Sequence, residues 1–225
     1  MILPTMKRER ELYGQGYQRI AGVDEVGRGP LAGPVVAAAV ILPQRPKRKL
    51  TKSLRDSKLL SAKARERLDI EIREQAVAVG VGMVDVETID RMGIAEASRD
   101  AMRRAMAGLS SQPDYALLDY VVKFRCDVPF VAIIDGDALC CSIAAASIVA
   151  KVHRDAMMRD LDTRYPNYGF AQHKGYSTPE HREALRLLGP TPIHRRSFFP
   201  IAQLTMDLDG ATASVDEVAE SWERS

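Results

Sequence analysis

The sequence has few cysteines and lacks a long hydrophobic run, and each shortage excludes a class of protein. The three cysteines, Cys126, Cys140 and Cys141, are odd in number, and their spacing is not that of a metal-binding motif. We interpret them as reduced thiols and therefore expect a cytoplasmic protein. No apolar stretch is long enough to cross a membrane, and the charged residues that follow Pro4 argue against a signal peptide.

The length of 225 residues predicts one domain, or one domain with appendages. We divide the chain into an N-terminal lead-in over residues 1–19, a domain over residues 20–206 and an acidic tail over residues 207–225. The net charge of +2 is unevenly spread, because the tail carries −5 and leaves +7 on the rest of the chain. A moderately basic domain suits a polyanionic partner without requiring one.

Five apolar runs predict the strands of a central sheet. The first two, Ile20–Val23 and Val35–Leu42, flank a short polar turn and have the composition of buried strands. The other three cover residues 77–84, 115–119 and 130–134. Two strands therefore precede the first long helical segment, and the last two lie close together in the sequence.

Helical patterns fill most of the intervals between these strands and after them. Capping residues and apolar spacing predict helices over residues 61–76, 94–109, 140–164, 179–188 and 214–223. Residues 43–55 are predicted as a loop because two prolines block regular structure there, and this basic stretch is typical of a solvated surface. The order of elements predicts a mixed α/β domain, with helices on the faces of the sheet and a helical C-terminal part.

Acidic residues follow three of the predicted strands. Asp24 and Glu25 end the first strand, Asp119 ends the fourth, and Asp137 follows the fifth. If these strand ends lie side by side, four carboxylates converge and attract cations, with Mg²⁺ or Mn²⁺ favoured over zinc. The alternatives are ordinary: a polar turn for the first pair, a turn acid for Asp119 and a helix N-cap for Asp137.

Two further features accompany these acids. The glycines of Gly27-Arg28-Gly29 allow close approach of the backbone and leave peptide N–H groups free to donate. Ser147, Lys151 and Asp155 are spaced four apart on the predicted long helix and therefore share a face. Lys151 either binds a phosphate or forms an ion pair with Asp155 within the helix, and the sequence does not decide between these.

Taken together, the motifs resemble those of the bacterial ribonuclease HII family. The resemblance extends from about Ala21 to Phe198, and it rests on several segments that occur in the order expected for that family. They are Asp24–Val35, Asp56-Ser57-Lys58, Ile143–Val152, Arg154-Asp155, Tyr168-Gly169-Phe170, His173–Tyr176 and His194–Phe198.

The resemblance implies a ribonuclease H-like fold and a metal-dependent endonuclease. The expected substrates are RNA–DNA hybrids, whose RNA strand is hydrolysed, and duplex DNA with a single embedded ribonucleotide, which is incised on the 5′ side of that nucleotide. Two Mn²⁺ or Mg²⁺ ions would act in catalysis, leaving a 5′-phosphate and a 3′-OH, as in ribonucleotide excision repair. The resemblance also leads us to expect a monomer that does not bind membranes.

The family's site residues transfer onto this sequence one by one. Its four catalytic and metal-binding acids correspond to Asp24, Glu25, Asp119 and Asp137. Its substrate-binding residues correspond to Gly27, Arg28, Gly29, Lys58, Ser147, Lys151, Tyr176, Arg195 and Arg196. Within this set, Gly27–Gly29 would read the ribose 2′-OH, Tyr176 would lie against the deoxyribose on the 3′ side, and the cationic side chains would neutralise phosphates. Of the histidines, His173 and His194 are expected to be framework or phosphate-side groups, and His153 and His181 surface residues.

The sequence departs from the family pattern at two places beside the acids. Tyr120-Val121 stands where the family usually has glycine and asparagine, and Asp135 replaces a lysine. Neither change removes a proposed metal ligand. The alternatives that we keep are a catalytically impaired module that binds hybrids on the same fold, and a different polynucleotide nuclease with this fold.

Overall fold

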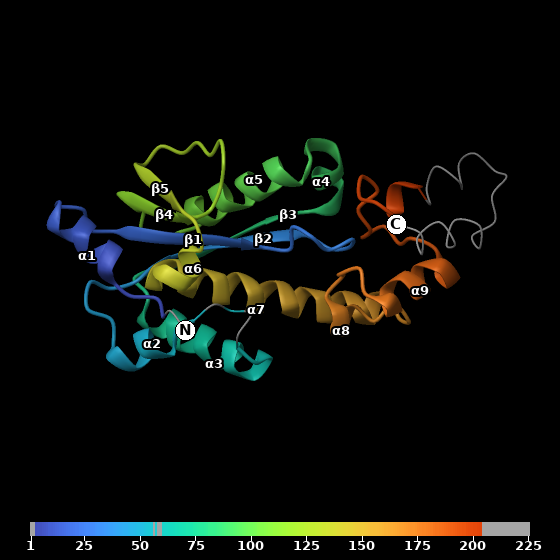
Figure 1. The fold of residues 1–225 in the computed structure, drawn as a ribbon, viewed down its shortest axis with the longest axis horizontal. Coiled ribbons are helices and arrows are strands. Elements are labelled where there is room, and N and C mark those ends of the chain that lie inside the picture. Colours follow the sequence, from blue (N-terminus) through green and yellow to red (C-terminus); the bar gives the residue numbers. More distant parts are fainter. Residues whose placement is uncertain (1–2, 56, 58–59, 204–225) are drawn as a thin grey trace.

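A mixed five-stranded sheet forms the centre of the molecule (Figure 1). The computed structural model describes residues 3–55, 57 and 60–203. The strands are β1 (Ile20–Val26), β2 (Val35–Ile41), β3 (Ala78–Val84), β4 (Tyr115–Asp119) and β5 (Phe130–Ile133), in the spatial order β3-β2-β1-β4-β5. β2 pairs antiparallel with β1 and β3, whereas β4 pairs parallel with β1 and β5. The C-terminal ends of β1 and β4 are therefore neighbours.

Helices cover both faces of this sheet (Figure 1). They are α1 (Lys7–Gly14), α2 (Arg48–Ser53), α3 (Ala62–Gln75), α4 (Val86–Met92), α5 (Ile94–Ala107), α6 (Gly136–Leu139), α7 (Cys141–Arg164), α8 (Phe170–His173) and α9 (Pro179–Leu188). α5 lies on one face, and the long α7 crosses the other face with α2 and α3 outside it.

Each face of the sheet has its own hydrophobic core, and both cores include side chains of β2, in which every residue is buried. Alternate side chains of a strand point to opposite faces, so Ala37 and Ala39 pack towards α5 while Ala38 and Val40 pack towards α7. A strand buried on both sides reads as a continuous apolar run, which explains the unbroken hydrophobic sequence of residues 35–42.

The start of α7 lies unusually close to β1. A Cβ added to Gly22 would lie 2.1 Å from the backbone carbon of Ser142, so only glycine fits at this position. Glu9 of α1 fixes the same helix end, because its Oε1 accepts hydrogen bonds from Ser142 N (2.9 Å) and Ser142 Oγ (2.7 Å). The close contact brings one face of α7 alongside the acidic end of β1.

The fold class predicted from the sequence is confirmed, with two local corrections. The segment 43–55 is not entirely loop, because α2 forms after Pro46 and anchors its fully buried Leu50 in the core. The segment 166–175, which the sequence predicts as a loop because of its glycines, contains the short helix α8. The predicted helix over residues 214–223 and the acidic tail lie outside the described residues.

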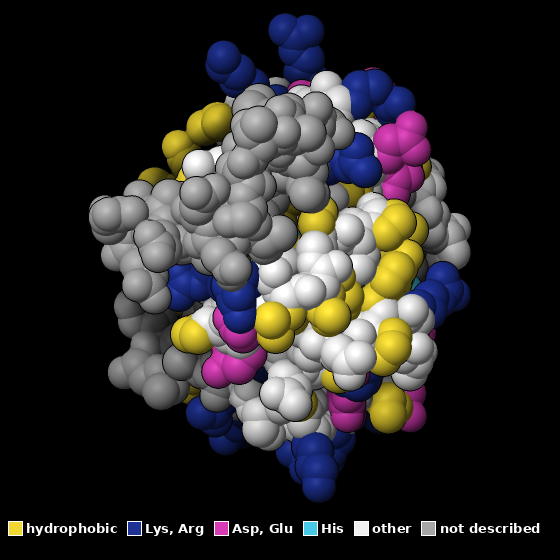
Figure 2. All heavy atoms as spheres, turned by 90° about the vertical axis from the view of Figure 1, so that its right-hand side faces the viewer, with side chains coloured by type: hydrophobic (Ala, Val, Ile, Leu, Met, Phe, Trp, Pro, Cys, Tyr) yellow, Lys and Arg dark blue, Asp and Glu magenta, His cyan; other side chains and the backbone are white. Residues whose placement is uncertain are grey.

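The C-terminal part joins α8 and α9 to the far end of α7. Met158, Phe170 and Leu185 form its buried cluster, together with Leu31 from the loop after β1. Figure 2 views the molecule from this end, and its Lys and Arg side chains lie mainly around the margin, with apolar and uncharged groups between them. The positive charge is therefore not concentrated in the middle of this face. In the described ranges, no helix is long and apolar enough to span a membrane.

Candidate active site

The four carboxylates predicted from the sequence converge on one pocket. Asp24 lies in β1, and Asp119 ends the adjacent strand β4, one residue beyond the paired Val23 and Leu118. Asp137 reaches the same place from α6, and with Glu25 the acids line a cavity of about 310 Å³. The other lining residues are Val26, Ser57, Ser147, Lys151 and Tyr176. The parallel pairing of β1 and β4 thus creates the acidic centre.

Asp24 is the most enclosed of these acids, with only 5% of its surface exposed. Burial raises its pKa well above the ordinary value, and the negative charges of the neighbouring carboxylates raise that pKa further. A hydrogen bond with Ser147 acts in the opposite direction. Asp24 Oδ1 also accepts a 2.7 Å hydrogen bond from the backbone N–H of Glu25. The carboxylate is therefore fixed in place, and no lysine or arginine of the described residues forms an ion pair with it.

Glu25 and Asp119 are held by different groups. Arg28 Nη1 lies 3.2 Å from Glu25 Oε1, yet burial still raises the pKa of Glu25. Its buried Oε2 has no hydrogen-bond partner among the described residues. Asp119 Oδ1 accepts a 2.8 Å hydrogen bond from the N–H of Gly136. This bond ties the end of β4 to α6, the helix that carries Asp137.

The chemistry of this pocket fits a hard divalent cation. Its acidic donors are all oxygens, their charges repel one another, and Glu25 Oε2 is buried without a partner. Within the part of the chain that is described, no three His, Cys, Asp or Glu side chains are already grouped as a metal site.

The loop after β1 is held by two buried arginines. Arg195 donates to the carbonyl oxygens of Gly27 (2.5 Å), Arg28 (2.8 Å) and Gly33 (2.8 and 3.1 Å). Arg154 donates to the carbonyls of Ala32, Pro34 and Lys174. Gly27 has a φ of 93°, and an added Cβ would lie 2.3 Å from Arg154 Nε, so the loop needs glycine there.

The same loop lies beside the aromatic ring predicted to sense the sugar. Gly29 faces Tyr176, because a Cβ on Gly29 would lie 3.9 Å from Tyr176 Cε1. Tyr176 is 42% exposed and also lines the acidic pocket, so it is not simply a ring packed within its loop. The backbone of the glycine loop, the tyrosine ring and the carboxylates therefore border one another.

Three comparisons with known proteins identify the family of this chain. The family model of ribonuclease HII matches residues 21–200. The chain belongs to the ribonuclease HII family. It is 53% identical over 199 residues to a ribonuclease HII of Geobacillus kaustophilus, covering 88% of this chain and 75% of the relative. It is 52% identical over 201 residues to a ribonuclease HII of Dehalococcoides mccartyi, covering 89% of this chain and 95% of that relative.

Solved structures support the same assignment. The crystal structure of the ribonuclease H2 from Pyrococcus horikoshii superposes with a TM-score of 0.73 at 26% identity, covering 85% of this chain and 99% of that one. A ribonuclease HIII crystallised with Mn²⁺ shares the fold, with a TM-score of 0.69 at 20% identity over 84% and 70% of the chains. This ribonuclease HII family member is therefore a metal-dependent endonuclease with ribonuclease H activity on RNA–DNA hybrids.

One predicted phosphate ligand of this family member needs correction. Arg195 is fully buried, its guanidinium is occupied by the loop carbonyls, and its carbon Cζ lies 4.9 Å from the centre of the Phe198 ring. It positions the loop after β1, and its buried guanidinium is not accessible to a substrate phosphate. Arg196 is exposed instead, and its backbone N–H is fixed by a 2.9 Å hydrogen bond to Asp90. Two consecutive arginines thus lie in opposite environments.

Lys151 forms an ion pair with Asp155, which is one of the two alternatives that the sequence left open. Its Nζ lies 2.7 Å from Asp155 Oδ1, although Lys151 also lines the acidic pocket. Asp155 contacts Arg65 of α3 at 3.5 Å, so three charged groups join α7 to α3. Lys58, the other lysine proposed to bind phosphate, lies outside the described residues.

Sequence reasoning gave no role to Ser57 or Arg65. Ser57 Oγ lies 3.0 Å from Ser147 Oγ, and Ser147 in turn bonds Asp24. Arg65 donates to the backbone carbonyls of Ser57 (2.9 Å) and Leu60 (2.7 Å). The motif Asp56-Ser57-Lys58 pointed to this segment, but only the folded chain shows Arg65 holding it beside the acids.

The histidines also require a correction. His181, predicted at the surface, is fully buried, and its Nε2 lies 3.0 Å from Nε2 of the buried His194. His173 stacks on His181 with ring centres 4.3 Å apart. His181 Nδ1 bonds the carbonyl of Tyr176 at 2.9 Å, so the histidine cluster supports the loop that carries that tyrosine. His153 is exposed, as predicted.

Proposed function

We propose that this enzyme incises duplex DNA on the 5′ side of a single embedded ribonucleotide, in addition to hydrolysing the RNA of hybrids. The observation that supports this proposal is the shared border of three features: the four carboxylates, the Gly27–Gly29 loop and Tyr176. The loop offers backbone N–H groups that suit the 2′-OH, the group that distinguishes RNA from DNA. A loop that binds the ribose 2′-OH next to the hydrolytic carboxylates suits a substrate in which a ribonucleotide adjoins DNA.

Two divalent ions would be held by Asp24, Glu25, Asp119 and Asp137, with Asp24 as the bridging ligand. Bound there, such ions supply an activated water and stabilise negative charge on the phosphate and on the leaving 3′-oxygen. A relative of this fold was crystallised with Mn²⁺, which is compatible with either Mn²⁺ or Mg²⁺ at these oxygens. The products would be a 5′-phosphate and a 3′-OH.

The remaining side chains orient the duplex around this centre. Arg196 and Lys58 neutralise backbone phosphates, and the ring of Tyr176 lies against the deoxyribose on the 3′ side. Ser147 and Ser57 keep the Asp24 carboxylate in a fixed orientation through their hydrogen bonds. We further propose that the enzyme acts as a cytoplasmic monomer in the removal of ribonucleotides from DNA.

The alternative, an inactive module that binds hybrids, rested on the altered residues beside the acids. Tyr120 is 54% exposed, and neither it nor the exposed Asp135 lines the acidic pocket. Asp135 precedes α6 in a left-handed conformation, with a φ of 53°, and Asp137 lies buried within that helix. These positions therefore leave the proposed metal ligands in place.

Cleavage of a labelled DNA duplex with one ribonucleotide tests the proposal, with an all-DNA duplex as control. We expect one cut 5′ of the ribonucleotide in Mn²⁺ or Mg²⁺, and none with chelator or in the control duplex. Asp24→Asn should abolish this cut while binding to the duplex is largely kept. Binding without cleavage by the unmodified enzyme would favour the inactive module, and wild-type turnover by D24N would refute the metal assignment.

A further inference from the structure

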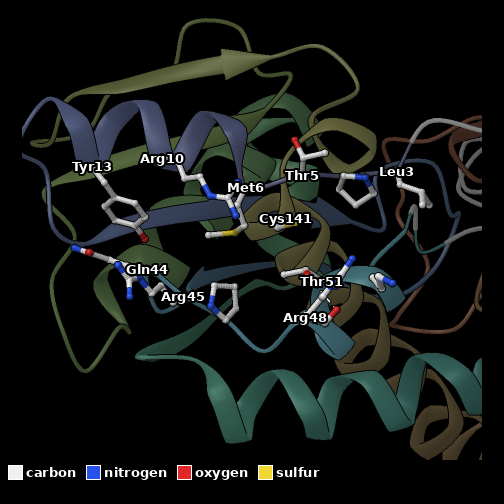
Figure 3. A pocket seen from close by; sticks show the side chains of 13 residues that line it. Leu3, Thr5, Met6, Arg10, Tyr13, Gln44, Arg45, Arg48, Thr51 and Cys141 are labelled. Carbon is white, nitrogen blue, oxygen red and sulfur yellow. Dashed lines mark hydrogen bonds between the residues drawn. The ribbon is translucent and has the colours of Figure 1, made fainter.

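A second cavity lies outside the active site. It has a volume of about 860 Å³ and lies among the N-terminal segment with α1, the segment from Gln44 to Lys52, and the start of α7 (Figure 3). None of its lining residues also lines the acidic pocket. Its volume is within the range of cavities that hold small ligands.

The walls of this cavity carry positive charge only. Its charged lining residues are Arg10, Arg45, Arg48 and Lys52, and no Asp or Glu lines it. Figure 3 shows Arg10 reaching in from α1, and Arg45 and Arg48 coming from the opposite segment. Cations on two sides of one hollow can converge on a single anion.

In the described part of the chain, these four side chains lack an ion-pair partner. Among the described residues, none of the four forms an ion pair or a side-chain hydrogen bond, although neighbouring cations do. Lys49 pairs with Glu71 at 3.6 Å, and Arg8 pairs with Glu11 at 3.2 Å. All four side chains are exposed, and no carboxylate of the described residues pairs with them, so they are available to an anion.

Most of the remaining lining residues are apolar. Met6 and Cys141 among them are buried, and Pro46 also lines the cavity. Tyr13 is held by a 3.4 Å hydrogen bond from its hydroxyl to the carbonyl of Leu42, which keeps its ring beside the cavity. An aromatic ring with apolar neighbours offers a surface for a flat heterocycle, and arginine forks match phosphate oxygens.

From this lining we propose that the cavity binds a phosphate-bearing nucleotide unit. The arginines and Lys52 hold the phosphate, and the apolar lining beside Tyr13 receives the base. Such a unit can be a free nucleoside phosphate or one nucleotide of a strand that extends beyond the active site. Because the two pockets share no lining residue, this site is independent of the cleavage chemistry.

Isothermal titration of the full chain with ADP, adenosine and a short single-stranded oligodeoxynucleotide tests this site. Chelator is present, so that no metal ion carries a nucleotide to the carboxylates. The test variant is R45Q/R48Q, and the control is K47Q/K49Q, which removes the same charge from the same segment but from side chains outside the lining. Thermal unfolding verifies that each variant is folded.

We expect ADP to bind at least tenfold more tightly than adenosine. R45Q/R48Q should weaken binding of ADP at least tenfold, and K47Q/K49Q should weaken it less than twofold. Stronger binding of the oligonucleotide, lost in the same variant, would identify a strand as the source of the nucleotide. No binding by either phosphate-bearing probe, equal loss in both variants, or adenosine binding as tightly as ADP would overturn the proposal.

Discussion

Replacing Arg195 and Arg196 separately with glutamine distinguishes a positioning arginine from a surface arginine at adjacent positions. Arg195 donates to three backbone carbonyls of the loop after β1 and is fully buried. A buried polar group left without a partner costs about 1–3 kcal/mol. Since the loop can relax and one amide can still donate, we expect R195Q to lower the free energy of unfolding by about 3–5 kcal/mol. That is a large part of the total for a typical domain, about 5–15 kcal/mol.

Arg196→Gln should leave stability almost unchanged. Its side chain is exposed, and surface substitutions of this kind change the free energy of unfolding by less than about 0.5 kcal/mol. If Arg196 contacts a phosphate, R196Q should weaken binding of a hybrid duplex. It should also reduce the slope of log affinity against log salt concentration by about 1.

Urea unfolding followed by far-ultraviolet circular dichroism measures the stability of R195Q and R196Q. Binding titrations at several salt concentrations measure the affinity of R196Q for the hybrid duplex and its salt dependence. Equal slopes of free energy against urea would show that the unfolded states are comparable. The reasoning fails if R195Q lies within about 1 kcal/mol of the unmodified enzyme, or if R196Q loses as much stability as R195Q.

Two further predictions concern supports of the site. Burial holds the pKa of His181 at about 4 and that of His194 at about 3, below the ordinary 6.5. As pH falls from about 6.5 towards 4, the unfolded chain takes up these protons first, so stability should decline by up to about 1.4 kcal/mol per pH unit per histidine. Urea unfolding at pH 7.5, 6 and 5 measures this decline, and a flat profile would contradict it. Arg65→Gln should release the Ser57 segment and lower kcat on an RNA–DNA hybrid about tenfold, which is about 1.4 kcal/mol, with partial rescue by R65K. Unchanged steady-state kcat would refute this role for Arg65.

Much of the framework could be predicted because local pattern and fold agree. The helix predicted over residues 179–188 has the predicted bounds, since Thr178 caps it and a proline begins it. The acids could be predicted as a group because strands that pair in parallel end at the same edge of a sheet. By contrast, the helix α2 was missed because proline restricts only the residues near it, and Leu50 supplies the burial that stabilises the helix.

The direction in which a polar side chain points could not be predicted. Arg195 and Arg196 are adjacent and chemically identical, and only the carbonyls of a loop far away in the sequence draw the first inward. His181 lies on a helix with polar neighbours, and its burial depends on His194 from another segment. Such roles depend on contacts between residues far apart in the sequence, and local sequence patterns do not reveal these contacts.

The hydrogen bonds from Arg195 to the loop after β1 also have a consequence for how the enzyme is synthesised. Arg195 follows Gly27 by 168 positions and Arg28 by 167 positions in the chain. On the ribosome, the loop after β1 is therefore synthesised well before the arginine that holds it. The strand that carries Asp24 is made equally early, whereas the hydrogen bonds from Arg195 can form only after most of the polypeptide has been made.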